Sequence, residues 1–138
     1  MPPLEQPVQS PADRTQRMSY AGDLTVEEAV EKLRGGAVLV DVRTETEWQQ
    51  VGVPVTNDDG APARFIEWNR IDGSRNTGFL NELQPLRGKE LLLLCRSGRR
   101  SIDAAISATA AGHTAYNVLG GFEAAGGWQQ SDLSWKRG

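Results

Sequence analysis

The pattern of apolar and polar positions along the chain first predicts strands. Residues 37–43 and 91–94 contain apolar runs without a polar break, which is typical of strands buried on both faces of a sheet. Residues 115–119 predict a last strand nearer the C-terminus. Weaker signals predict brief strands or extended segments at residues 19–22, 52–55 and 64–68.

Helical patterns alternate with these strands. Thr25 and Glu28 have the spacing of a capping box, so a helix is expected to begin there and to end at Gly35. Thr44 and Glu47 repeat the same spacing and predict a second, short helix.

A third helix is expected after the leucine run and ends at Gly112. Its expected apolar face, at i, i+3, i+4 and i+7, is Ile102, Ala105, Ile106 and Thr109. Short helices are also expected at residues 79–86 and 122–125, and a loop at residues 71–78.

This alternation of strands and helices predicts an α/β domain with a mainly parallel sheet. The length of 138 residues suits one domain, which we place at residues 18–138. Residues 1–17 are rich in proline, glutamine and charge, and we expect them to form a loosely ordered tail. Ligands of such sheets bind beyond the carboxyl ends of the strands, where Asp41, Arg43, Cys95 and the pair Gly120-Gly121 fall.

Composition and charge narrow the classes of function. The net charge of −3 argues against general nucleic-acid binding, and no apolar stretch approaches membrane-spanning length. The single cysteine excludes an intrachain disulfide, and the N-terminal stretch lacks the apolar core of a secretory signal. We therefore expect a cytoplasmic protein without nucleic-acid or membrane partners.

The lone cysteine, Cys95, stands where the leucine run stops and the third helix begins. Arg96, Ser97, Gly98, Arg99 and Arg100 follow it, and this loop offers backbone donors and permanent cations to an anion. A helix N-terminus and arginines favour the thiolate form of a cysteine, so the setting predicts a nucleophile. The alternative is a buried structural cysteine at a strand end. His113 is the only histidine, which argues against a Cys–His catalytic pair and against a structural zinc site.

The segment from Cys95 to Ser101 resembles the active-site loop of single-domain rhodanese-type sulfurtransferases. The resemblance extends to residues 39–43 with Glu47-Trp48, and to residues 116–122, so that it covers about residues 19–130. It implies a three-layer α/β/α fold around a five-stranded, mainly parallel sheet. It also implies that Cys95 takes sulfane sulfur from a donor such as thiosulfate and passes it to cyanide or a thiol, with no metal or organic cofactor.

The resemblance also suggests roles for the residues around Cys95. The amides of residues 96–100 would hold a persulfide, and Arg96, Arg99 or Arg100 would attract a small anionic donor. We assign Asp41, Arg43 and Ser101 a supporting place around the thiol. For the first two, an ordinary salt bridge at a strand end is an equal alternative.

The chain departs from the family pattern at its middle. The turn at Gly52-Val53-Pro54 is shorter than the family's Gly-His-Ile-Pro, and residues 56–79 form a long segment. That segment either lines the pocket or is a solvated loop. Glu45 and Glu47 also fit a solvated helix face, and we expect Trp128 and Trp135 to pack.

Two rival functions stay open. A cysteine-based phosphatase or arsenate reductase needs His-Cys, five residues and then arginine, whereas this chain has Leu94 before the cysteine and Ser101 at the arginine position. The loop from the cysteine to the arginine is one residue shorter here than in the phosphatase pattern, and this favours binding of sulfane sulfur over binding of phosphate. The second rival is a non-catalytic sulfur-carrier or signalling module, in which Cys95 hands its sulfur to the thiol of a partner protein.

Overall fold

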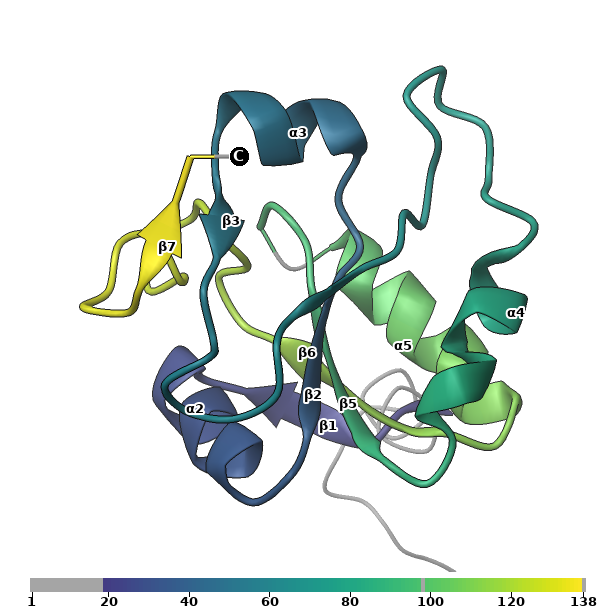
Figure 1. Ribbon diagram of the computed structural model, residues 1–138. Helices are drawn as coiled ribbons and strands as arrows, with labels where there is room; N and C mark the ends of the chain where they lie inside the picture. Colours follow the sequence, from purple (N-terminus) through teal and green to yellow (C-terminus); the bar gives the residue numbers. More distant parts are fainter. Residues whose placement is uncertain (1–18, 98, 138) are drawn as a thin grey trace, which may run out of the picture.

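The computed structural model describes residues 19–97 and 99–137, and its centre is a five-stranded sheet (Figure 1). The strand order is β1-β6-β5-β2-β4, and every neighbouring pair in this sheet is parallel. The expectation of a mainly parallel, five-stranded sheet is therefore confirmed. The tail predicted at residues 1–17 lies outside the described residues.

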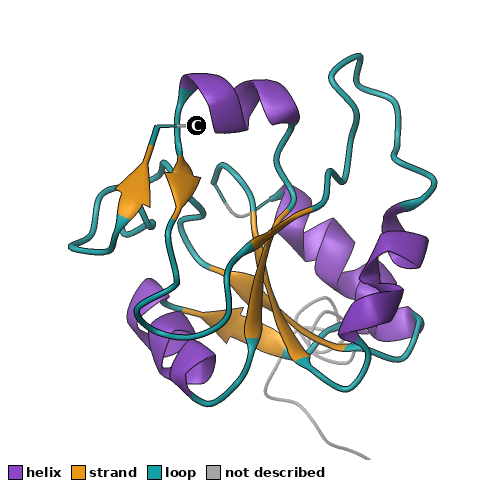
Figure 2. Ribbon diagram, viewed as in Figure 1, coloured by secondary structure: helices purple, strands orange, loops and turns teal. Residues whose placement is uncertain are grey.

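The elements follow one another in alternation, as the sequence predicted (Figure 2). In the first half they are β1 (Gly22–Leu24), α2 (Val26–Arg34), β2 (Val38–Asp41), α3 (Glu45–Gln50), β3 (Val53–Pro54) and β4 (Arg64–Phe65). In the second half they are α4 (Phe79–Leu83), the 3-10 turn η1 (Gln84–Leu86), β5 (Glu90–Leu94), α5 (Arg100–Ala110), β6 (Thr114–Val118) and β7 (Trp135–Lys136).

Helices cover both faces of the sheet, because alternate residues of its central strands point to opposite sides. Leu92 and Leu94 pack with the apolar stripe of α2, whereas Leu91 and Leu93 pack with α4 and α5. All four leucines are fully buried. The side chain of Cys95 continues this alternation and joins the cluster on the α5 side.

Both predicted capping boxes are present. The Thr25 hydroxyl accepts a hydrogen bond from the Glu28 backbone N–H, and the Glu28 carboxylate accepts one from the Thr25 backbone N–H. Thr44 and Glu47 are bonded in the same way at α3. Because the first turn of each helix has backbone N–H groups without helical partners, these contacts fix where the helices begin.

Several local expectations were wrong. The first strand is Gly22–Leu24 rather than residues 19–22, and residues 122–125 form turns instead of a helix. The two-residue strands β3 and β7 pair antiparallel in a separate sheet, whose second strand was not predicted.

The buried face of α5 also differs from the one predicted. It is Ser101, Ala104, Ala105 and Ala108, whereas Ile102 and Ile106 are only partly buried. Small residues on this face allow the helix to lie close to the leucines of β5, so the larger isoleucines are turned toward its flanks.

The long middle segment is ordered by packing and is more than a solvated loop. Trp68 is buried, stacks edge-on with Phe79 at 5.0 Å, and carries the Arg75 guanidinium 3.8 Å from its ring centre. The buried amide of Asn76 donates to the Glu67 carbonyl at 2.7 Å. These contacts attach the segment to α4.

His113 is buried and lies directly before β6. Burial, with a smaller contribution from the charge of Arg87, lowers its pKa. Since β6 is parallel to β5, His113 lies at the opposite end of the sheet from Cys95.

The turn after β6 approaches the Cys95 segment so closely that it requires glycine. Gly121 has a φ of +55°, and a Cβ at this position would overlap the Cys95 carbonyl oxygen and come within 2.7 Å of the Arg96 carbonyl carbon. Both constraints are backbone constraints, so side-chain rotation cannot relieve them.

Replacing Gly121 by alanine should therefore destabilise the protein by about 3–5 kcal/mol, from backbone strain and overpacking together. Gly126→Ala is the matched control, because Gly126 has a φ of +78° with open space around it and should lose only about 1–2 kcal/mol. Denaturant unfolding measures both variants, and equal losses would contradict the close approach.

Candidate functional site

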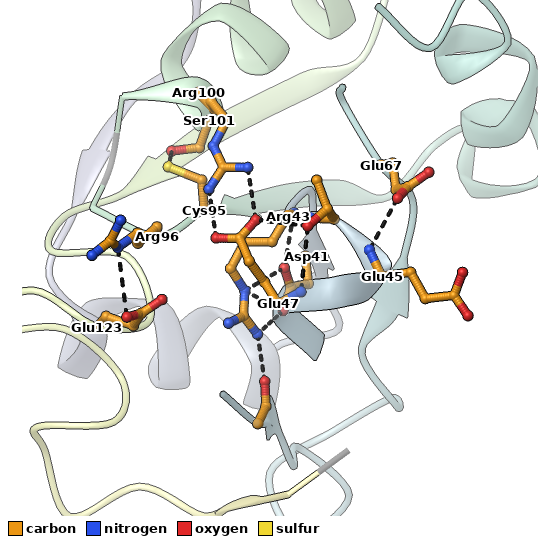
Figure 3. Close-up of polar contacts among 12 residues, drawn as sticks. Asp41, Arg43, Glu45, Glu47, Glu67, Cys95, Arg96, Arg100, Ser101 and Glu123 are labelled. Atoms are coloured by element: carbon orange, nitrogen blue, oxygen red, sulfur yellow. Dashed lines mark hydrogen bonds and ion pairs between the residues drawn. The ribbon is translucent and has the colours of Figure 1, made fainter. Parts of the chain in front are cut away.

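Cys95 lies directly after β5, at the carboxyl end of the sheet, and its loop leads into α5 (Figure 3). Its side chain is 1% exposed and its Sγ lies 3.2 Å from the Oγ of Ser101, a buried residue in the first turn of α5. Gly98 lies outside the described residues. The predicted neighbour Ser101 is thus in direct contact with the thiol.

The backbone of the Cys95 segment is held by the turn after β6. The Phe122 N–H donates to the Cys95 carbonyl at 2.7 Å, and the Glu123 N–H donates to the Arg96 carbonyl at 3.0 Å. Residues 122–125, where a helix was predicted, form turns, and the Ala124 N–H donates to the Gly120 carbonyl. The pair Gly120-Gly121 thus belongs to the site through its backbone.

Arg100 is the loop arginine bound most firmly to the protein. Its guanidinium donates to both carboxylate oxygens of Glu47 at 2.9 and 2.8 Å, and both side chains are partly buried. Burial acts to raise the pKa of Glu47, but hydrogen bonds from Arg100 and Thr44 outweigh it and lower this pKa to about 2. The same carboxylate raises the pKa of Arg100.

Glu47 was predicted only as a capping residue or as part of a solvated helix face. It caps α3 and binds Arg100 at once, so it joins the start of α3 to the start of α5. The capping spacing accounted for the residue fully, and nothing in the sequence indicated a partner 53 positions away.

The other two loop arginines are more exposed. Arg96 has an ion pair with Glu123 at 3.5 Å, and the Arg96 side chain is 67% exposed. Arg99, which is also exposed, makes no ion pair within the described part of the chain. A depression of about 340 Å³ lies beside the loop, lined by Arg96, Ser97, Glu123 and Ala124. No residue of the 56–79 segment lines it.

Asp41 and Arg43 form a fully buried ion pair at the end of β2, with Nη2 and Oδ2 2.8 Å apart. Arg43 also donates to the Gly52 carbonyl at 2.8 Å, and its guanidinium lies 4.2 Å from the centre of the Phe122 ring. The pair therefore reaches Cys95 through Phe122. The two residues therefore do form a salt bridge at a strand end, and it is fully buried.

Two further polar residues are connected to Ser101, and neither was predicted as a site residue. The Oγ of Ser101 donates to the Oδ1 of buried Asn117, and the Nδ2 of Asn117 donates to Asp23 at 2.9 Å. Asn117 lies in the segment that resembles the family, but its residue type alone did not indicate a contact with the loop.

Within residues 19–97 and 99–137, no group of three histidine, cysteine, aspartate or glutamate side chains is placed to hold a metal ion. None of the helices in this part of the chain combines the length and the apolar character needed to cross a membrane.

The fold and the site together define a class: a parallel three-layer α/β/α domain with a cysteine at the carboxyl end of its central strand. Residues 25–128 match the family described as the rhodanese-like domain. The chain belongs to this family, and the predicted membership and fold are confirmed.

Solved and curated relatives agree with this assignment. The crystal structure of Rv0390 from M. tuberculosis is 46% identical, with a TM-score of 0.80 over 86% of this chain and 99% of that one. The "Uncharacterized protein RP600 homolog" of Rickettsia rickettsii is 38% identical over 72% of this chain and 83% of its own length. The rhodanese-like domain protein of Staphylococcus aureus is similar in fold, at 22% identity and a TM-score of 0.54 over 82% of this chain and 96% of that one.

The paired state of Glu47 predicts a pH dependence of stability. Its pKa in the folded protein, about 2, lies below the ordinary value of 4.5, so its ion pair stabilises the fold above pH 4.5. That contribution is lost as the pH falls from 4.5 toward 2.

Glu47→Gln should therefore lose stability at neutral pH and should show a shallower further decline between pH 5 and pH 2 than the unsubstituted protein. Urea unfolding across this range gives the comparison, with Glu27→Gln, at an exposed position of α2, as the control. Parallel declines in all three proteins would show that the pair does not carry this pH dependence.

Proposed function

We propose that this protein is a sulfurtransferase that moves sulfane sulfur through a persulfide on Cys95. A small anion such as thiosulfate would be the donor. Cyanide or a thiol, including the thiol of a partner protein, would be the acceptor. The observation that carries the proposal is the placement of the chain's single cysteine between β5 and the N-terminus of α5, beside three arginines, in a rhodanese-like domain.

The chemistry balances with one nucleophile. The Cys95 thiolate attacks the outer sulfur of thiosulfate, a new S–S bond forms, and the old S–S bond breaks as sulfite leaves with its electron pair. The acceptor then attacks the terminal sulfur of the persulfide and the Cys95 thiolate is restored. Backbone donors and the dipole of α5 would stabilise the anionic sulfur in both steps, and neither step calls for a metal or an organic cofactor.

The arginines differ in what they offer to an anionic donor. The charge of Arg100 is already compensated by Glu47, and Arg96 has the weaker contact with Glu123. Arg99 is exposed beside the loop and is the residue we propose for attracting the donor. Long-range attraction of this kind raises the encounter rate of an anion and weakens with salt.

Phosphate chemistry is the weaker alternative. The position where the phosphatase pattern has arginine is Ser101, and the arginine one place earlier is held by a carboxylate. A non-catalytic sulfur carrier would use the same thiol and differ only in needing a specific protein acceptor. We also propose a cytoplasmic setting, where reducing conditions keep a single thiol reduced, and neither a nucleic-acid nor a membrane partner.

Purified protein should form thiocyanate from thiosulfate and cyanide, should leave p-nitrophenyl phosphate intact, and should lose the thiocyanate activity in Cys95→Ser. Ser74→Ala, at an exposed position of the middle segment away from the site, is the matched control that keeps the nucleophile and its loop. Mass spectrometry after thiosulfate treatment should show one added sulfur on Cys95. A persulfide without thiocyanate turnover would favour the carrier, and phosphate release without thiocyanate would overturn the proposal.

Arg99→Ala should raise KM for thiosulfate about 3- to 10-fold at low ionic strength, with little change in stability because the side chain is exposed. Arg87→Ala removes the same charge from an exposed position before β5, at the other end of the sheet, and should leave KM unchanged. Steady-state kinetics at two salt concentrations measure both. An unchanged KM in Arg99→Ala would remove Arg99 from donor binding.

A further inference from the structure

A line of hydrogen-bonded side chains runs from Cys95 across the sheet to its edge strand. Cys95 contacts Ser101 on α5, Ser101 donates to Asn117 on β6, and the Asn117 amide donates to Asp23 on β1. The hydroxyl of Tyr20 donates to the same Asp23 oxygen at 2.9 Å. Ser101 and Asn117 are buried, whereas Asp23 is exposed, so the line connects the thiol to the surface.

The outer end of this line fixes the direction of every bond in it. An ionised carboxylate accepts hydrogen bonds only, so the Asn117 group that faces Asp23 must be its NH₂. The amide oxygen of Asn117 therefore faces Ser101. Burial, together with the hydrogen bond and the charge of Asp23, raises the pKa of Tyr20 to about 12, so its hydroxyl stays a donor throughout the neutral range.

The inner end of the line then sets the direction of the contact between Ser101 and the thiol. A serine hydroxyl has a single proton, and an amide oxygen can only accept. The Ser101 proton points at Asn117, at an O···O distance of 2.5 Å, so it does not point at Cys95. The contact of 3.2 Å between sulfur and Oγ is a hydrogen bond only when the sulfur carries the proton.

We propose that Asn117 and Asp23 are positioning residues that keep the Ser101 hydroxyl turned away from Cys95 and thereby hold the resting nucleophile as a hydrogen-bonded thiol. The proposal rests on the proposed function in one respect, that Cys95 is the nucleophile. On ionisation the thiol proton goes to solvent, since the amide oxygen of Asn117 is not a base. The Ser101 hydroxyl then turns from Asn117 to the sulfur and leaves that oxygen without its donor.

Charged groups on several elements act on the same thiol. Arg100 on α5 interacts electrostatically with Cys95 and with Asp41 of β2, and Glu47 of α3 compensates part of its charge. Arg43 is paired with Asp41, and Asp23 lies at the far end of the line on β1. The cations favour the thiolate, and the hydrogen-bonded line opposes them.

Asp23→Asn is the variant that allows the hydrogen bonds from residue 23 to Ser101 to reverse their direction. An asparagine at position 23 can donate to the Asn117 oxygen, which permits the Asn117 amide to turn over and donate to Ser101. The Ser101 proton then becomes available to the sulfur. The Tyr20 hydroxyl, which in the unsubstituted protein donates to the same Asp23 oxygen as Asn117, accepts from the amide at position 23 instead. Iodoacetamide alkylation reports the thiolate of Cys95 alone, because the chain has no other cysteine.

The pH at which alkylation reaches half its maximal rate should fall by about one unit in Asp23→Asn, as expected for one hydrogen bond gained by a charged group. Tyr20→Phe leaves both Asp23 and the Asn117 bond in place and should not move the profile. An unmoved profile in Asp23→Asn would overturn the proposal.

Loss of the Asp23 charge alone would shift the profile in the same direction, and a double-mutant cycle separates the two causes. In a Ser101→Ala background no hydroxyl is present to turn, so adding Asp23→Asn should move the profile by less than about 0.3 units. A shift that persists in this background is a charge effect and would overturn the proposal. Thermal unfolding shows that each variant is folded.

The unsubstituted protein provides a second measurement. At neutral pH its infrared spectrum should contain one S–H stretching band, lowered in frequency by the bond to Ser101, and Ser101→Ala should raise that frequency. Absence of the band would overturn the proposal. No step uses a sulfur donor, so a failed thiosulfate assay with these results would reject the proposed function and leave this inference standing.

Discussion

The buried ion pair of Asp41 and Arg43 is the interaction on which the carboxyl end of the sheet depends. Arg43 alone contacts the end of β2, the Gly52 carbonyl and the Phe122 ring. The backbone of Phe122 in turn holds the Cys95 carbonyl. An unpaired charge at a fully buried position is costly, so neither partner can be removed alone without disturbing all of these segments. The pair places the loop without touching the nucleophile.

The loop arginines near the nucleophile differ in how far their charge is compensated by a partner. Arg100 is bound by both oxygens of Glu47 and fixes the first turn of α5, whereas Arg96 and Arg99 remain toward solvent. The same residue type therefore serves structure at one position and remains available to an anion at another. Buried bidentate pairs are geometrically specific, and exposed arginines are long-range attractors.

Much of the fold could be predicted from local patterns. The apolar runs indicated the three central strands, and two capping boxes indicated where α2 and α3 begin, because both signals depend on neighbours in sequence. The turns at residues 122–125 could not be predicted in this way, since the Phe122 and Glu123 N–H groups bond to the carbonyls of Cys95 and Arg96, which lie far away in the sequence. The strand β7 has two residues, too few for any periodicity to show.

Some residues of the candidate site could likewise be predicted from a local pattern, and others could not. Cys95 and its loop were recognisable from a contiguous motif, and Ser101 follows directly from it. Glu47, Asn117 and Asp23 reach the loop from other elements, through contacts that only the folded chain creates. Their residue types fit a helix cap, a strand end and an edge strand equally well, so no local pattern predicted these contacts.

The single cysteine has one further consequence for the proposed cycle. Many proteins that carry reactive sulfur discharge it through a second thiol in the same chain, which closes an internal disulfide. No such thiol exists in these 138 residues. A sulfur atom held on Cys95 therefore cannot be released by another thiol of the same chain. Its release requires an acceptor molecule from outside, and the arrival of that acceptor determines when the sulfur leaves.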